Sequence, residues 1–420
     1  IFAFGGHASD SQITTWANMP AKLAITEMLN FQEHNLKLSP LAAGERYRQT
    51  ATRYGKLVDF ATFISDPNSD IPIPQNRREQ YAVGKYNFDD TFVRLVTTRG
   101  LNPFRQRIGF WETNYHLAVN LDTDVRREQI AVYYDEIMEA HEAGLPYHQV
   151  MGVAAKSAAV AMQYGHRRNE WVFDRNQDKY VLKGNYDFAR EIHQLFYGIF
   201  GENDPNHENG TIIETGKMLT DMRVNYIGGD VGYPTSVTFG TEDHHADSLQ
   251  ILGRTISGAT ASQKIDNLMP ISINHPESLA KLPSMIIGTL ADDNLTPAKV
   301  AQLNASWASM GYSSKNLLSF LQAYAISDLF HGTDQRKYFT SHERSLFLAN
   351  KFNLDNLESF FGGDYYSGRA GRQVDNIIDG DAAGEIFRPL HNVFGGQTSL
   401  EAADSSLAFE KNYNFHTHTE

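Results

Sequence analysis

Apolar residues recur every three to four positions in several long stretches, which is the pattern of an amphipathic α-helix. These stretches are 21–31, 125–143, 150–164, 188–200, 300–310 and 317–329. Alternating apolar and polar residues are scarce, and only the Gly-rich segment 223–240 is expected to hold a hairpin or a long loop. The pattern predicts a mostly α-helical, multi-helix globular fold with at most one small sheet or hairpin.

Two segments have the composition of helix starts. The first, SDSQITTW, begins at Ser9. In the second, NGTIIETG, Thr211 and Glu214 have the spacing of a capping box, in which each side chain bonds a free backbone N–H group. Both segments are therefore predicted to open a helix.

The composition and periodicity of the chain change near its C-terminus. From residue 353 the sequence is rich in Gly and Asp and loses its helical period, so 353–420 is predicted to be a loop-rich extension. Residues 1–352 are predicted to form the helical core, which can divide into two lobes, 1–165 and 184–352. The length of 420 residues suits two or three domains.

The composition excludes several classes of function. Acidic residues number 50 and Lys plus Arg 37, and this net charge of −13 repels phosphate backbones, so no nucleic-acid partner is expected. The absence of Cys excludes disulfides, iron–sulfur clusters and c-type haem attachment. No apolar run reaches the ~18 residues of a transmembrane span. Because the chain begins without Met or a signal peptide, we expect a mature or truncated product whose export signal precedes this sequence.

The common catalytic motifs do not occur. The His-Glu pairs at His141, His207 and His342 lack the second His of a zinc-protease helix. Segment 210–218 resembles a phosphate-binding loop but has one residue too many between its glycines. A nucleophile elbow, G-x-S-x-G, is missing too. The motifs therefore name no reaction.

Segment 185–200 is predicted to be one strongly amphipathic helix. At 100° per residue its apolar face consists of Phe188, Ile192, Leu195, Phe196 and Ile199. Glu191 lies at the edge of this face, where a carboxylate needs a partner because burial of an unpaired charge is costly.

The other polar residues of this segment have two interpretations. Arg190 points nearly opposite the apolar face and His193 lies on its far flank, while Asn185 or Asp187 is suitably placed to cap the helix. A solvated face explains Asp187, Arg190 and His193, whereas a functional cluster would include Arg190 and Glu191. The sequence leaves both interpretations open.

Two further segments combine His with acidic residues. Trp111 and His116 are predicted on an aromatic helix, where His116 is either a site residue or a core histidine with one hydrogen-bonded nitrogen. The segment TEDHHAD places His244 and His245 beside Asp247, and forms either a metal site or an exposed polar loop.

Five motifs in a fixed order resemble one bacterial family, catalogued as domain of unknown function 1800. They are FAFGG at 2–6, FWETNYHL at 110–117, NYDFAREIHQLF at 185–196, HHADSLQILG at 244–253 and HPESLAKL at 275–282. The resemblance covers roughly 1–352 and implies a mostly helical, usually exported bacterial protein with no established reaction. The chain departs from the family pattern at Tyr186, Asp187, Gln194 and His245.

Two hypotheses for the function follow. In the first, the chain is an exported enzyme in which Glu191 and His116 act as general base or metal ligand and Arg190 holds an anion. A divalent metal (zinc, iron, manganese or calcium) would then be bound by His244, Asp247 and His116. In the second, the chain is a non-catalytic periplasmic or extracellular binding or assembly protein, in which these residues form a buried polar brace.

Partners are constrained only broadly. The 20 Tyr and 25 Phe residues fit a protein interface or a glycan-stacking groove. The sequence is therefore compatible with several partners: a small molecule, a glycan, another protein, or further copies of the chain in a homo- or hetero-oligomer. Convergence of His116, Glu191 and His244 in space would favour the enzyme.

Overall fold

The fold is taken from a computed structural model of the chain. It describes residues 10–31, 103–117, 127–226, 234–311 and 315–337, and a few single residues outside these ranges, among them Phe2. The predicted extension 353–420 lies outside the described residues. Within the described part, no helix combines the length and the apolar character that crossing a membrane requires.

The chain forms two compact units, each built from segments that are distant in the sequence. Unit 1 comprises Ile1–Leu121, Ile286–Ala301 and Leu317–Glu420, and unit 2 comprises Asp122–Met285 and Gln302–Asn316. This division differs from the continuous lobes 1–165 and 184–352, and the domain boundaries of the sequence analysis stay a prediction.

Unit 1 is helical in its described part. It contains α1 (Asp10–Ala17), α2 (Ala21–Met28), α6 (Pro103–Trp111), the π-helical turn η1 (Glu112–His116), α15 (Leu317–Ile326) and α16 (Asp328–His331). Phe2 joins an aromatic cluster with Phe104, Tyr324 and Phe330, at ring-centroid distances of 6.1, 6.5 and 5.5 Å. The helix start predicted at Ser9 is confirmed, because α1 begins one residue later.

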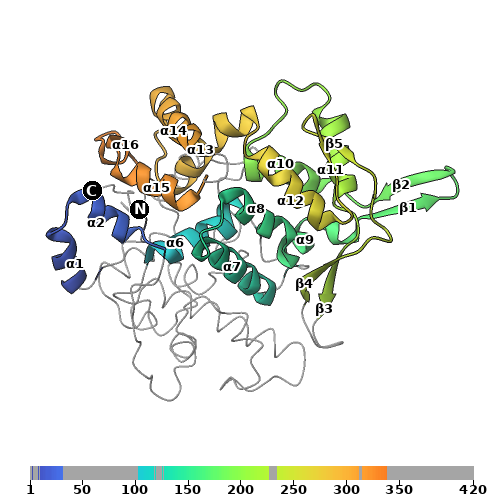
Figure 1. The fold of residues 1–420 in the computed structure, drawn as a ribbon, viewed down its shortest axis with the longest axis horizontal. Coiled ribbons are helices and arrows are strands. Elements are labelled where there is room, and N and C mark those ends of the chain that lie inside the picture. Colours follow the sequence, from blue (N-terminus) through green and yellow to red (C-terminus); the bar gives the residue numbers. More distant parts are fainter. Residues whose placement is uncertain are drawn as a thin grey trace, which may run out of the picture. The chain divides into compact units, whose positions relative to one another are not determined.

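Unit 2 holds the helices around the candidate site. They are α7 (Arg127–Glu142), α8 (Tyr147–Lys156), α9 (Ala158–Gln163), the 3₁₀ helix η2 (His166–Arg168), α10 (Asp187–Tyr197), the π-helical turn η3 (His207–Ile212), α11 (Ile213–Met218) and α12 (Ala261–Ser272). Helices α13 (Pro276–Leu290) and α14 (Pro297–Ser309) each contribute to both units. The mostly α-helical fold is thus confirmed (Figure 1).

The predicted helix 150–164 is two helices. Ser157 has an extended backbone (φ −71°, ψ 146°), which ends α8, and its hydroxyl accepts a hydrogen bond from the Ala159 N–H at 3.3 Å, which caps α9. The capping box predicted at Thr211 and Glu214 is wrong. Thr211 lies inside η3, and α11 begins at Ile213 without a side-chain cap because the chain is already helical there.

Three antiparallel hairpins accompany the helices of unit 2. They are β1 (Glu170–Asp174) with β2 (Lys179–Lys183), β3 (Met222–Tyr226) with β4 (Pro234–Phe239), and β5 (Leu249–Ile251) with β6 (Arg254–Ile256). The β3–β4 hairpin confirms the prediction for 223–240, whereas the expectation of at most one hairpin is wrong. The β5–β6 turn places Leu252 and Gly253 at φ +52° and +67°, the positive values that a two-residue hairpin turn requires.

Helix α10 is surrounded by protein on nearly all sides. The predicted apolar face is confirmed, since Phe188, Ile192, Leu195 and Phe196 are fully buried. The helix is shorter than 185–200, because Gly198 adopts the left-handed conformation (φ +69°) that ends a helix.

The predicted surroundings of α10 need two corrections. His193 is fully buried rather than solvated, because η3 and α11 cover the flank on which it lies. Asn185 does not cap the helix, since its side-chain amide donates to the Tyr164 carbonyl at 3.0 Å, and the N-cap residue Tyr186 makes no side-chain cap.

Candidate functional site around helix α10

Glu191 is a buried carboxyl on the second turn of α10. Only 4% of the residue is exposed, and its Oε2 has no hydrogen-bond partner among the described residues. Burial raises the pKa of Glu191 from its ordinary value of 4.5 to about 8, with Arg190 opposing this rise and Asp187 adding to it. Glu191 therefore carries a proton at neutral pH and is able both to donate and to accept a hydrogen bond.

Tyr164 contacts the half-buried Asn185 and, through Phe188, is linked to the buried His166. The Tyr164 ring stacks on Phe188 at 5.4 Å, and the Glu191 carboxylate contributes, after burial, to raising the pKa of Tyr164 far above its usual range. The Asn185 side-chain N–H donates to the Tyr164 carbonyl. The Asn185 Oδ1 atom has no partner in the described part of the chain. The Phe188 ring also stacks on His166, at 4.4 Å and 13° between ring planes.

His166 is fully buried, and neither ring nitrogen has a hydrogen-bond partner within the residues that the structure describes. Burial lowers the pKa of His166 to about 3, so its ring is neutral, with one N–H donor and one acceptor nitrogen. Gly165 precedes it at φ +70°, and a Cβ there would lie 2.9 Å from Asn185 Nδ2. We call Tyr164, His166, Asn185 and Glu191 the Glu191 site.

Glu191 could be identified from the sequence as a candidate site residue, but Tyr164 and His166 could not. Tyr164 and His166 lie at the end of an apolar helix and had no pattern of their own. The one available signal was Gly165, because a glycine directly after a helix often turns the chain back toward the structure.

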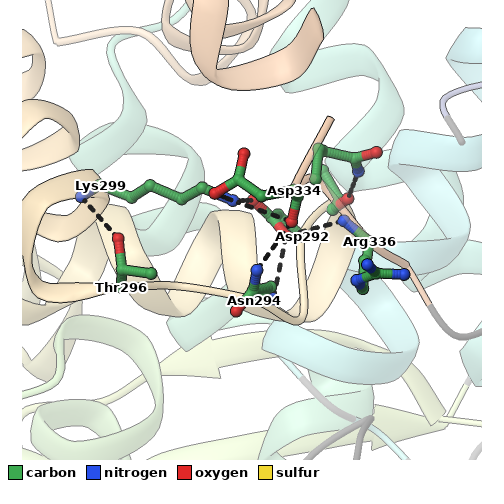
Figure 2. A network of polar contacts seen from close by, with 8 residues as sticks. Asp292, Asn294, Thr296, Lys299, Asp334 and Arg336 are labelled. Atoms are coloured by element: carbon green, nitrogen blue, oxygen red, sulfur yellow. Dashed lines mark hydrogen bonds and ion pairs between the residues drawn. The ribbon is translucent and has the colours of Figure 1, made fainter. Parts of the chain in front are cut away.

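A polar network in unit 1 shows how this chain satisfies a buried charge (Figure 2). Asp292 Oδ1 accepts hydrogen bonds from the backbone N–H groups of Asn294 (2.9 Å) and Arg336 (3.1 Å), while Oδ2 pairs with Lys299 Nζ at 2.8 Å. Lys299 also pairs with Asp334 at 3.2 Å. Both Asp292 oxygens are therefore satisfied, as a structural brace requires.

Arg190 contacts a polar group outside its own helix. Its Nη2 pairs with Glu208 Oε2 of η3 at 2.7 Å, and both side chains are exposed to solvent. An exposed ion pair of this kind contributes at most ~1 kcal/mol to stability. Arg190 therefore links η3 to α10 and moderates the pKa of the neighbouring Glu191.

His193 belongs to a second polar cluster, on another side of α10. The Thr215 hydroxyl donates to the Thr211 carbonyl (2.7 Å), so at the 2.8 Å contact between His193 Nε2 and Thr215 Oγ1 the histidine donates. His193 Nδ1 is then an acceptor, and it has no partner in the described segments. Burial lowers the pKa of His193 to about 3, with smaller effects from His207 and His275.

The packing of His207 in this cluster can be tested by replacing Gly201 with Ala and measuring the loss of stability. Gly201 has φ +72°, and a Cβ there would lie 2.3 Å from Cγ of His207. Gly144 has φ +68° and open space around it, so Gly144→Ala is a matched control that costs ~1–2 kcal/mol of backbone strain. Gly201→Ala is expected to cost a further ~1–3 kcal/mol for the steric conflict. Equal losses in denaturant unfolding would contradict the close packing of His207 on Gly201.

The two adjacent histidines of unit 2 are both buried, so the exposed-loop interpretation is wrong for them. A carbonyl oxygen can only accept a hydrogen bond, so His244 Nδ1 donates to the Thr220 carbonyl at 3.0 Å, and its Nε2 has no partner in the described chain. Lys264 Nζ donates to the carbonyls of His245 and Asp247, which fixes this loop on α12.

His116 lies in η1 of unit 1. Its Nδ1 contacts Glu112 Oε1 at 2.7 Å, and its ring stacks on Trp111 at 5.3 Å. These contacts fit the interpretation of His116 as a core histidine. Because Glu191 and His244 belong to unit 2, the meeting of all three residues stays a prediction.

No group of three His, Asp or Glu side chains in the described ranges is arranged to hold a metal ion. The predicted ligands are divided between the units, His116 in unit 1 and His244 with Asp247 in unit 2. The Asp247 side chain is exposed, whereas His244 is buried. This ligand set therefore stays a prediction without geometric support.

Comparison with known protein families identifies the family of the chain. A family model described as "Protein of unknown function (DUF1800)" matches residues 2–340. No curated protein and no solved structure matches the chain. The family resemblance of the sequence analysis is confirmed, and it supplies no reaction.

Proposed function

Because the chain belongs to the DUF1800 family, whose function is unknown, we propose its activity from the geometry of unit 2: it is an enzyme in which Glu191 is a general acid–base residue. The observation that carries this proposal is the buried Glu191 carboxyl with an unpaired Oε2 in the described part of unit 2. A pKa of about 8 lies close to neutral pH, where a general acid–base group is most effective.

The unpaired atoms favour a site over a structural brace. A buried polar atom without a partner costs ~1–3 kcal/mol, so a purely structural residue is expected to be paired, as Asp292 is. Glu191 Oε2, Asn185 Oδ1 and both nitrogens of His166 are instead unpaired among the described residues, as are His193 Nδ1 and His244 Nε2 elsewhere in unit 2. Polar groups kept ready for a substrate account for this cost.

The chemistry of these groups indicates the substrate class. Glu191 is protonated at neutral pH, His166 is neutral, and Asn185 offers an amide oxygen. Such a set binds an uncharged polar substrate, because it offers no compensating charge to an ion. In the proposed reaction Glu191 protonates a substrate oxygen, His166 and Asn185 orient the substrate, and Arg190 is a positioning residue that tunes the Glu191 pKa.

An exported location is part of the proposal, and it rests on the resemblance to a family whose members are usually exported. Fractionation of the native host, with an antibody against this chain, tests it directly. Recovery of the mature protein in the cytoplasmic fraction alone would contradict export.

Wild type and Glu191→Gln are to be compared for activity on a bacterial envelope extract, analysed by mass spectrometry. We expect wild type and the exposed-carboxylate control Glu242→Gln to change the same compounds, and Glu191→Gln to change them at least ~100-fold more slowly. An extract that wild type leaves unchanged would contradict the enzyme and favour the alternative, a non-catalytic binding or assembly protein.

A further inference from the structure

Three aromatic side chains share one face of the β1–β2 hairpin. Phe173 is paired with Tyr180 and Trp171 with Leu182 across the two strands, and residues two apart on a strand point to the same side. Phe173 is 47% exposed and Tyr180 58% exposed, while Trp171 is half-buried. We call Trp171, Phe173 and Tyr180 the aromatic platform. Figure 1 shows the hairpin extending away from the helices of its unit.

The platform is held in place at its base. The backbone N–H of Trp171 donates to the Asp243 carbonyl at 2.8 Å, and the Trp171 ring meets the His245 ring edge-on, with the ring centroids 4.5 Å apart. Lys217 Nζ lies 5.5 Å from the centre of the Trp171 ring. The Tyr180 ring is within 16° of parallel to that of Trp171, at 6.4 Å. An ordered pair of near-parallel rings requires little reorganisation on binding, which favours affinity.

The exposed area is small for a protein interface. Three rings of ~150–250 Å² each, about half exposed, present roughly 200–400 Å². A stable protein partner needs about 800 Å² on each side, so the platform alone is too small for one.

The charges around the platform favour an uncharged ligand. Lys183 pairs with Glu170, Lys217 with Glu214, and the Asp174 carboxylate accepts hydrogen bonds within its own turn. The tip of the hairpin carries the exposed charges Arg175, Asp178 and Lys179. Burial of this tip in a bilayer would strip these charges of water at high cost. A ligand lying on the near-parallel Trp171 and Tyr180 rings, with the Phe173 ring at 71° to the Tyr180 ring, leaves these charges hydrated.

We propose that the aromatic platform binds a neutral polysaccharide. A sugar ring has a face of C–H groups bordered by hydroxyls, which complements the electron-rich face of an aromatic ring bordered by polar side chains. This inference does not depend on the Glu191 site, and the two are tested by different residues.

Affinity gel electrophoresis of the full chain tests the proposal, with hydroxyethylcellulose and glycol chitin as neutral probes and dextran sulfate as the charged comparator. We expect a neutral probe to retard wild type and Phe200→Ala, whose ring is exposed elsewhere in unit 2. Tyr180→Ala and Phe173→Ala are expected to bind about tenfold more weakly. Because the Phe173 and Tyr180 rings are exposed, these two variants should melt at the same temperature as wild type. Trp171→Phe keeps an aromatic ring at this position and should retain binding.

Three outcomes would overturn the proposal. The first is that neither neutral probe retards wild type. The second is that Tyr180→Ala and Phe173→Ala, both folded, are retarded as strongly as wild type. The third is that these variants convert an oligomer to a monomer in sedimentation, because the platform would then be a contact between copies of the chain.

Discussion

Asp292→Ala is expected to destabilise unit 1 by ~3–5 kcal/mol, the typical loss when one partner of a buried ion pair is removed. The change leaves the buried Lys299 ammonium without its main partner, and it removes the acceptor of the Asn294 and Arg336 N–H groups. Denaturant unfolding, followed by a probe in unit 1, measures the loss.

Asp334→Ala is the matched control for this prediction. It removes the second carboxylate of the same lysine, but the Asp334 side chain is 56% exposed. Its loss should stay within ~1 kcal/mol, as for other exposed ion pairs. If both variants lose the same stability, the network is not the brace described above.

Acidification below pH 6.5 is expected to destabilise wild type more than His193→Gln, whose amide keeps a donor for Thr215. The folded state lowers the pKa of His193 to about 3 from 6.5, so its stabilisation is full above pH 6.5 and is lost progressively as the pH falls toward 3. At ~1.4 kcal/mol per pH unit, the advantage of wild type should shrink by about 2 kcal/mol between pH 6.5 and 5.

Unfolding free energies of the two proteins at several pH values measure this effect, and titrating groups that do not interact with His193 cancel in the difference. Glu191, whose pKa is shifted in the opposite direction, cancels in the same way. Two parallel curves would mean that His193 is not buried in a neutral state.

The sequence predicted the inner face of α10 well and its outer face badly, for one reason. A wheel of 3.6 residues per turn orders the side chains correctly, so Phe188 and Ile192 were identified as core and Glu191 as an edge residue. The same wheel assumes solvent on the remaining side. His193 is buried instead, because η3 and α11, distant in the sequence, cover that side.

Helix breaks and short hairpins depend on backbone conformation more than on apolar period. The period runs through Ser157, although the extended backbone there divides α8 from α9. The β5–β6 turn uses Leu252 at φ +52°, where a sequence-based prediction expects Asn or Gly. Strands of three to five residues are too short to produce a clear alternation.

The candidate site was only partly predictable for a related reason. The contact of His116 with Glu112 is local, four residues apart in the chain, and the interpretation of His116 as a core histidine was available from the sequence. The Glu191 site joins Tyr164 and His166 to α10 from more than 20 positions away, through stacking on Phe188. Contacts of this kind leave no pattern in a single sequence.

The protonation of Glu191 tests the central claim most directly. Protein labelled with ¹³C at the glutamate carboxyl carbons is to be titrated by NMR, with the Glu191 signal assigned by its loss in Glu191→Gln. The account predicts a midpoint near 8 for this signal, because burial disfavours the carboxylate. A midpoint near the ordinary value of 4.5 would mean that Glu191 is a solvated or paired carboxylate, and would contradict the proposed general acid.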